Sequence, residues 1–372
     1  NITGQVIGED IVVVQNFDDW SNFNTIGRPQ YAGWVTLQNT TFDLVGSNVH
    51  VDAFSAKLKV DNEDVLIDQC FVKSGSNNAL LEGTISQATS ERPKVELRME
   101  TPELWVDSLM TWEFDDTEES DNDFGFDFTI QLQIGQFHYE DFTGTQLTGT
   151  IFNKGPKLMG TDFFFQSCSG QMASNWALAP ESTGSRFWTH LSARDLQIEA
   201  LMASFNSFDI EDLDASNLLG TAWAETEMTL HFDENWDTFA ERTSIDGTIQ
   251  IENGTLQHYE PLGELSAFID QSELERIQFS NLQTSFQVRG DTFILPETEV
   301  QNSALNLWVN GWQHLETDDI DYSVRLGLKD LALRGKNSNR DLGNWISEAE
   351  NQQQPYIRLR IGCNLDDPCI AL

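Results

Sequence analysis

Residues 124–134 read FGFDFTIQLQI, and this stretch decides the class of fold. Large apolar side chains occupy every second position from Phe124 to Ile134, while glycine or polar residues fill the positions between them. Successive side chains of a β-strand point to opposite faces of its sheet. The alternation therefore predicts a strand with one apolar face and one polar face.

The same period of two recurs along most of the chain, with Gly, Asn and Asp turns between the segments. It is seen in Val49/Val51, Leu58/Val60, Ile249/Ile251 and Phe286/Val288. Short strands separated by such turns are typical of antiparallel sheets. We expect a mostly β fold: an elongated, curved antiparallel sheet assembly, folded over like a taco into a groove. Its accompanying helices are few and short, over 198–208, 262–276 and 340–350.

Three segments share one order of features, which indicates internal repeats: 33–85, 129–178 and 247–312. Repeats that cannot bury an apolar face alone must stack on one another. We expect a first β repeat region over 1–112 and a second over 113–217, which follows an acidic linker. The third is a C-terminal β region over 218–372, and it carries 262–276 as a helical insertion.

The charge of the chain limits its partners. The 372 residues include 21 Lys+Arg and 60 Asp+Glu, so the formal net charge is −39. Binding nucleic acid requires clustered cations that release counterions from phosphates, and the field of this chain repels polyanions. Apolar residues make up 39% of the chain and aromatic residues 11%, unlike disordered acidic chains. We expect a folded protein that does not bind nucleic acid.

The sequence contains no signature of catalysis. The G-x-S-x-G, H-E-x-x-H, phosphate-loop and dinucleotide motifs are all missing, so we expect no enzyme activity, no catalytic residue, no cofactor and no metal site. The tripeptide His-Tyr-Glu occurs at 138–140 and 258–260. Neighbouring side chains of a strand face opposite ways, which favours a duplicated strand end over a metal site.

The cysteines and the apolar strand faces each leave two alternatives open. Cys363 and Cys369 flank a turn-like loop, and they form either a disulfide or two free thiols. The apolar faces are either the packed core of a sandwich or the open wall of a groove for acyl chains. In a groove, each buried CH₂ is worth roughly 0.8 kcal/mol. A packed core and an open groove both require apolar residues at every second position, so the sequence pattern does not distinguish them.

The C-terminal region carries a series of motifs in a fixed order. They are IQIENGTL (249–256), YEPL (259–262), IQFSNL (277–282), FILPE (293–297), NSALN (302–306) with Gly311, IDY (320–322) and IGCNLDDP (361–368). Over residues 218–372 this order resembles the C-terminal region of the AsmA family. One departure is Cys363, which stands where the closing motif of the family usually has Thr.

The resemblance implies a periplasmic envelope protein of a diderm bacterium. Its membrane anchor, if it has one, would lie upstream of this chain. The family fold is related to bridge-like lipid transfer proteins, which implies phospholipid or another acyl-chain ligand, roles in intermembrane lipid transport and outer-membrane biogenesis, and envelope protein partners. The alternative is a non-catalytic structural or adaptor subunit of a larger cell-envelope complex.

Ten apolar positions are the expected lipid-binding residues of such a groove. They are Phe126, Phe128, Ile130, Leu132, Ile134, Ile249, Ile251, Leu305, Leu307 and Val309.

Overall fold

The computed structural model describes residues 3–14, 30–44, 47–112, 124–209, 214–259, 275–301, 307–327, 356–364 and 368–371. These residues form 19 strands and two short α-helices, so the predicted mostly β fold is confirmed. None of the helices in these ranges is long and apolar enough to span a bilayer.

The chain divides into two compact units. The first comprises Asn1–Phe165 and Ala177–Pro180, and the second comprises Gln166–Trp176 and Glu181–Leu372. Strands β9 (Lys157–Ser167) and β10 (Gly170–Glu181) contain residues of both units. The sequence predicts boundaries between repeats at 112/113 and 217/218. These positions differ from the limits of the two units, and the repeat boundaries stay predictions.

The other elements belong to one unit each. The first unit contains β1 (Thr3–Val14), β2 (Gln30–Asp43), β3 (His50–Asp61), β4 (Asp64–Ser74), β5 (Asn77–Ser86), β6 (Lys94–Trp105), α1 (Val106–Met110), β7 (Asp127–Tyr139) and β8 (Phe142–Lys154). The second contains β11 (Gly184–Gln197), α2 (Ile198–Ser204), η2 (Asn206–Asp209), β12 (Leu218–Phe232), η3 (Ala240–Arg242), β13 (Ser244–Gln257), β14 (Arg276–Arg289), β15 (Thr292–Val300), β16 (Leu307–His314), β17 (Asp319–Gly327), β18 (Tyr356–Asn364) and β19 (Pro368–Ala371).

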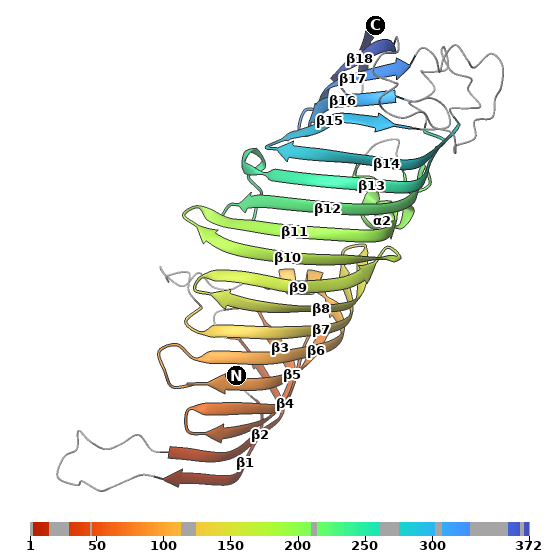
Figure 1. The fold of residues 1–372 in the computed structure, drawn as a ribbon. Helices are drawn as coiled ribbons and strands as arrows, with labels where there is room; N and C mark the ends of the chain where they lie inside the picture. Colours follow the sequence, from red (N-terminus) through yellow and green to blue (C-terminus); the bar gives the residue numbers. More distant parts are fainter. Residues whose placement is uncertain are drawn as a thin grey trace. The chain divides into compact units, whose positions relative to one another are not determined.

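Strands pair with their neighbours in chain order. From β1 to β8, every pair is antiparallel except β6 and β7, which are parallel with Lys94 opposite Asp127. The predicted antiparallel sheet assembly is thus confirmed, with this parallel pair as one exception among the described strands. Parallel neighbours need a crossover connection, and β7 accordingly starts beside Lys94, at the starting end of β6. All successive pairs from β11 to β19 are antiparallel. Figure 1 shows strands of each unit bending near one end, so each unit is a curved, open sheet.

The predicted helix over 198–208 is confirmed as α2 followed by the 3₁₀ turn η2. Ile198 and Met202 are its buried residues, one turn apart on the face that packs on β11 and β12. The predicted helix over 262–276 lies outside the described residues except at Glu275 and Arg276, where β14 begins. The predicted helix over 340–350 and the acidic segment 115–123 also lie outside them.

Three buried asparagines fasten strand ends through both atoms of the side-chain amide. Asn153 Nδ2 donates to Phe126 O at 2.7 Å, and its Oδ1 accepts from Phe128 N at 2.6 Å. Asn77 makes the same pair of bonds to the backbone of Trp105. Asn217 likewise accepts from one backbone N–H and donates to backbone carbonyls. These amides satisfy backbone groups that the ladders leave unpaired.

Replacing Asn153 with Ala should destabilise the protein by about 1–3 kcal/mol, because the Phe126 carbonyl and the Phe128 N–H lose their partner. Urea unfolding followed by circular dichroism measures this change. Asn78→Ala is the matched control, since the Asn78 side chain has no hydrogen-bond partner among the described residues. Equal midpoints for the two variants would show that the Asn153 bonds do not stabilise the start of β7.

Candidate functional site

One face of the first unit carries apolar side chains in rows that cross seven strands. The central row takes one residue from each strand from β2 to β8, and directly paired residues share a face of the sheet. Its members are Val35, Leu58, Ile67, Gly83, Leu97, Ile130 and Ile151. A parallel row consists of Leu37, Ala56, Cys70, Leu81, Met99, Leu132 and Gly149. We call these two rows the first apolar face.

The first apolar face is only partly shielded from water. Every member of the central row is half-buried, and only Ala56 and Cys70 of the second row are buried. In the described part of the chain, no large side chain is completely buried. Two sheets packed face to face would bury their inner side chains between them. The exposure therefore fits a single sheet layer with an accessible apolar face.

The opposite face of the same strands is polar and charged. Lys57, Glu82, Arg98 and Gln131 alternate with members of the apolar rows. Arg98 joins its neighbours by an ion pair to Glu100 at 2.7 Å and a hydrogen bond to Gln133 Oε1 at 2.9 Å. The charged side chains of the first unit thus gather on this face, and Leu66 and Leu80, which are 41% and 44% exposed, lie among them.

The predicted residues of β7 fall into two groups. Phe128, Ile130, Leu132 and Ile134 lie on one face, as the alternation requires; the first three are half-buried, and Ile134 is only 3% exposed. Phe126 lies outside the strand, because β7 begins at Asp127. Its ring is 37% exposed and contacts the rings of Phe124 and Phe128. The structure therefore gathers four of these five predicted residues in one line.

The second unit repeats the arrangement on its own strands. Ile249 pairs with Ala224 and Thr284, and Ile251 with Ala222 and Leu282. Near the C-terminal end, Val309 begins a row with Val324 and Leu359, and Leu307 a row with Leu326 and Ile357. We call these four rows the second apolar face. Ile249, Leu307 and Val309 are half-buried, Ile251 is buried, and Leu305 lies outside the described residues.

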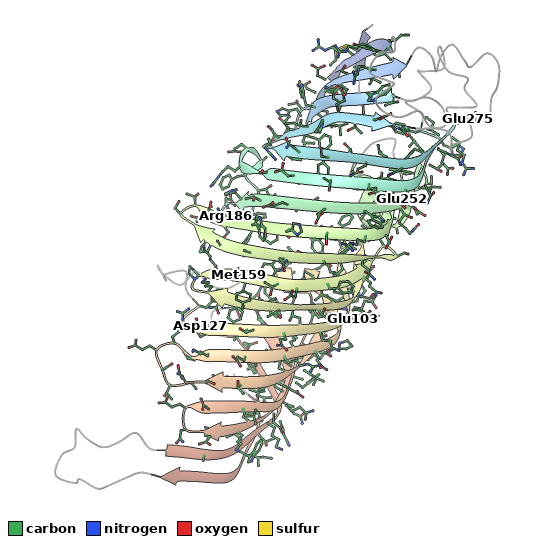
Figure 2. All side chains as sticks on the ribbon, viewed as in Figure 1. Glu103, Asp127, Met159, Arg186, Glu252 and Glu275 are labelled. Atoms are coloured by element: carbon green, nitrogen blue, oxygen red, sulfur yellow. A yellow bond between two sulfur atoms is a disulfide. The ribbon has the colours of Figure 1, made fainter. Side chains whose placement is uncertain are left out.

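The polar face of the second unit carries ion pairs. Arg360 bonds Asp321 through two contacts, Nε–Oδ1 at 2.8 Å and Nη2–Oδ2 at 2.7 Å. These hydrogen bonds lower the pKa of Asp321 below its ordinary value and raise the pKa of Arg360. Both groups therefore keep their charges around neutral pH. Figure 2 shows side chains projecting from both faces along the strands.

The two remaining sequence questions concern the cysteines and the His-Tyr-Glu repeat. Cys363 and Cys369 form a disulfide across the β18–β19 pair, which decides between the two alternatives. His138 bonds Glu103 at 3.0 Å and stacks on Trp105 with ring centroids 4.1 Å apart. In the described ranges no three His, Cys, Asp or Glu side chains gather as metal ligands would.

No family model, curated protein or solved structure matches this chain. Its candidate site therefore rests on the geometry of the apolar faces alone.

Sequence reasoning missed most of the first apolar face. The sequence pattern predicts Leu58 as a strand residue but not as a site residue, and it does not identify Ile67, Leu97 or Ile151. Their positions in the rows depend on which strands are neighbours and in which register. The alternation of apolar residues within each strand indicates which residues share a face. It does not indicate which residues of neighbouring strands lie side by side, and that pairing defines the rows.

Proposed function

We propose that the two apolar faces bind acyl chains of phospholipids or related lipids. The observation that carries this proposal is the central row of the first apolar face, which continues over seven strands while its side chains stay half-exposed. Half-exposed apolar rows of this length are unfavourable in water unless something apolar covers them.

The dimensions of the row suit an acyl chain. Neighbouring strands lie about 4.8 Å apart, so the six spacings from β2 to β8 cover about 29 Å. A hydrocarbon chain along the row contacts one residue on each strand, Gly83 being the one without a side chain, and each CH₂ removed from water contributes roughly 0.8 kcal/mol. The lipid head group remains at the margin, in water.

The cellular role follows from the resemblance to the AsmA family and is part of the same proposal. The protein would act without catalysis in the periplasm, where it would shield acyl chains during lipid transport between membranes and support outer-membrane biogenesis. The net charge of −39 keeps such a protein soluble, because like charges oppose association between copies.

Photolabelling tests the proposal. We expect the purified protein to carry lipid that organic extraction and mass spectrometry identify. After incubation with a palmitic acid that carries a diazirine, irradiation should label Leu97, Ile130 and Ile151. Their sequence neighbours Arg98, Gln131 and Thr150 are the internal control, because they face the other side of the same strands. Absence of lipid together with equal labelling of both faces would contradict acyl-chain binding.

A further inference from the structure

The polar face of the second unit contains a depression that the acyl-chain proposal does not use. It has a volume of about 180 Å³ and is lined by residues of β11 to β14. Two cross-strand rows form it. One row is Ser192, Glu225 and Thr248, and the other is Trp223, Gln250 and Gln283, with Arg194 beside them. These side chains belong to the face opposite that of Ile249, while Ala193, Ala224 and Ile249 itself complete the lining.

Three side chains of this depression have no partner within the described residues. The Trp223 indole, the Arg194 guanidinium and the Gln283 amide make no hydrogen bond or ion pair there. This is unexpected for Arg194 in a chain with 60 carboxylates and only 21 Lys and Arg. The Trp223 side chain is also 40% exposed, although indole is the largest apolar group available to a protein. Hydrogen-bond donors without a protein partner, placed beside an exposed aromatic ring, are typical of ligand sites.

The chemistry of the lining selects a class of ligand. The face of an indole ring packs against the C–H groups on one side of a sugar ring, while amides, hydroxyls, carboxylates and guanidinium groups hydrogen-bond its hydroxyls. The depression presents both kinds of group in adjacent rows. A polyanionic ligand is disfavoured by the net charge of −39. We propose that the polar face of the second unit binds an uncharged oligosaccharide, with Trp223 as the stacking platform.

A second depression on the same face also combines an exposed tryptophan with charged side chains. It has a volume of about 470 Å³, and its row runs from Trp312 through Asp321 to Gly362. Trp312 is 39% exposed, Gly362 adds no side chain to the row, and the Asp321–Arg360 pair lines the depression beside Ile320 and the Cys363–Cys369 disulfide. This depression is a further subsite for the same kind of ligand.

Isothermal titration calorimetry with three soluble hexasaccharides, maltohexaose, cellohexaose and chitohexaose, tests the proposal on the full chain. We expect at least one of them to bind. Trp223→Ala should weaken that binding by about tenfold or more, because truncating a central aromatic anchor removes most of the contact. Trp312→Ala should weaken it by a smaller factor.

Trp236→Ala is the matched control, since Trp236 is 61% exposed in the same unit but lines neither depression. It should bind like the unmodified protein. Circular dichroism verifies that each variant is folded, and Trp223→Phe, which keeps an aromatic face, should restore part of the affinity. Heats that show no binding for all three sugars, or equal losses for Trp223→Ala and Trp236→Ala, would overturn the proposal.

Discussion

Replacing Ile130 and Leu132 together with Asp should remove acyl-chain labelling from strands β6 to β8. The two residues sit in adjacent rows of the first apolar face, where Ile130 lies between Leu97 and Ile151, and Leu132 lies between Met99 and Gly149. Two ionised carboxylates there must lose hydration when a hydrocarbon chain covers them, at several kcal/mol for each ion. Since about 1.4 kcal/mol already changes affinity tenfold, labelling should fall by about tenfold or more.

The control for this variant lies on the same strand. Gln131→Asp with Gln133→Asp adds the same charge, but on the opposite face, where both side chains are exposed. We expect labelling of β6 to β8 to be unchanged in this control. Ile130 and Leu132 are half-exposed, so both double variants should fold, which far-UV circular dichroism verifies. Equal labelling of the two variants would mean that acyl chains do not lie on the first apolar face.

Replacing Gly83 with Ala should strongly destabilise the protein. Gly83 lies in the central row with φ +152°, and a Cβ atom there would stand 2.0 Å from the Glu96 carbonyl oxygen and 2.9 Å from Leu97 Cα. Both are backbone atoms of β6, so no rotamer change relieves the overlap. Strands β5 and β6 must separate, and backbone strain adds to the overpacking. We expect a destabilisation of roughly 3–5 kcal/mol.

Gly75→Ala is the comparison for this effect. Gly75 also has a positive φ, +57°, but no atom lies within 4 Å of a Cβ built there. The strain of a left-handed Ala alone amounts to about 1–2 kcal/mol. Urea midpoints of the two variants therefore separate steric overlap from backbone strain. A Gly83→Ala midpoint as high as that of Gly75→Ala would mean that β5 and β6 are not held this closely.

The period of two in the sequence was enough to predict the strands and their apolar sides. It placed Phe128, Ile130, Leu132 and Ile134 on one face because nothing interrupts β7. Strand β4 shows where the pattern fails. Ile67 and Cys70 are three residues apart yet share the apolar face, because an extra residue bulges between them. The sequence pattern changes phase there, so the rows of β4 could not be predicted.

Two other features depended on contacts distant in the chain. Phe126 continues the alternation but ends outside β7, where Asn153 of β8 binds its carbonyl oxygen. The parallel pairing of β6 with β7 leaves no mark on periodicity, because parallel and antiparallel neighbours both present every second residue to one face. Only the structure distinguishes an exposed apolar face from a packed core, since both require the same alternation.

The parallel β6–β7 pair also has a consequence for the order in which the chain folds. Antiparallel neighbours such as β3 and β4 close across a short turn as soon as the second strand is available. Lys94 meets Asp127 only after the intervening segment has been synthesised and has returned to the starting end of β6. Closing a longer loop loses more chain entropy before any contact forms. Strands β2 to β6 can therefore assemble hairpin by hairpin during translation, and the joining of β7 is the step at which folding of the first unit should pause.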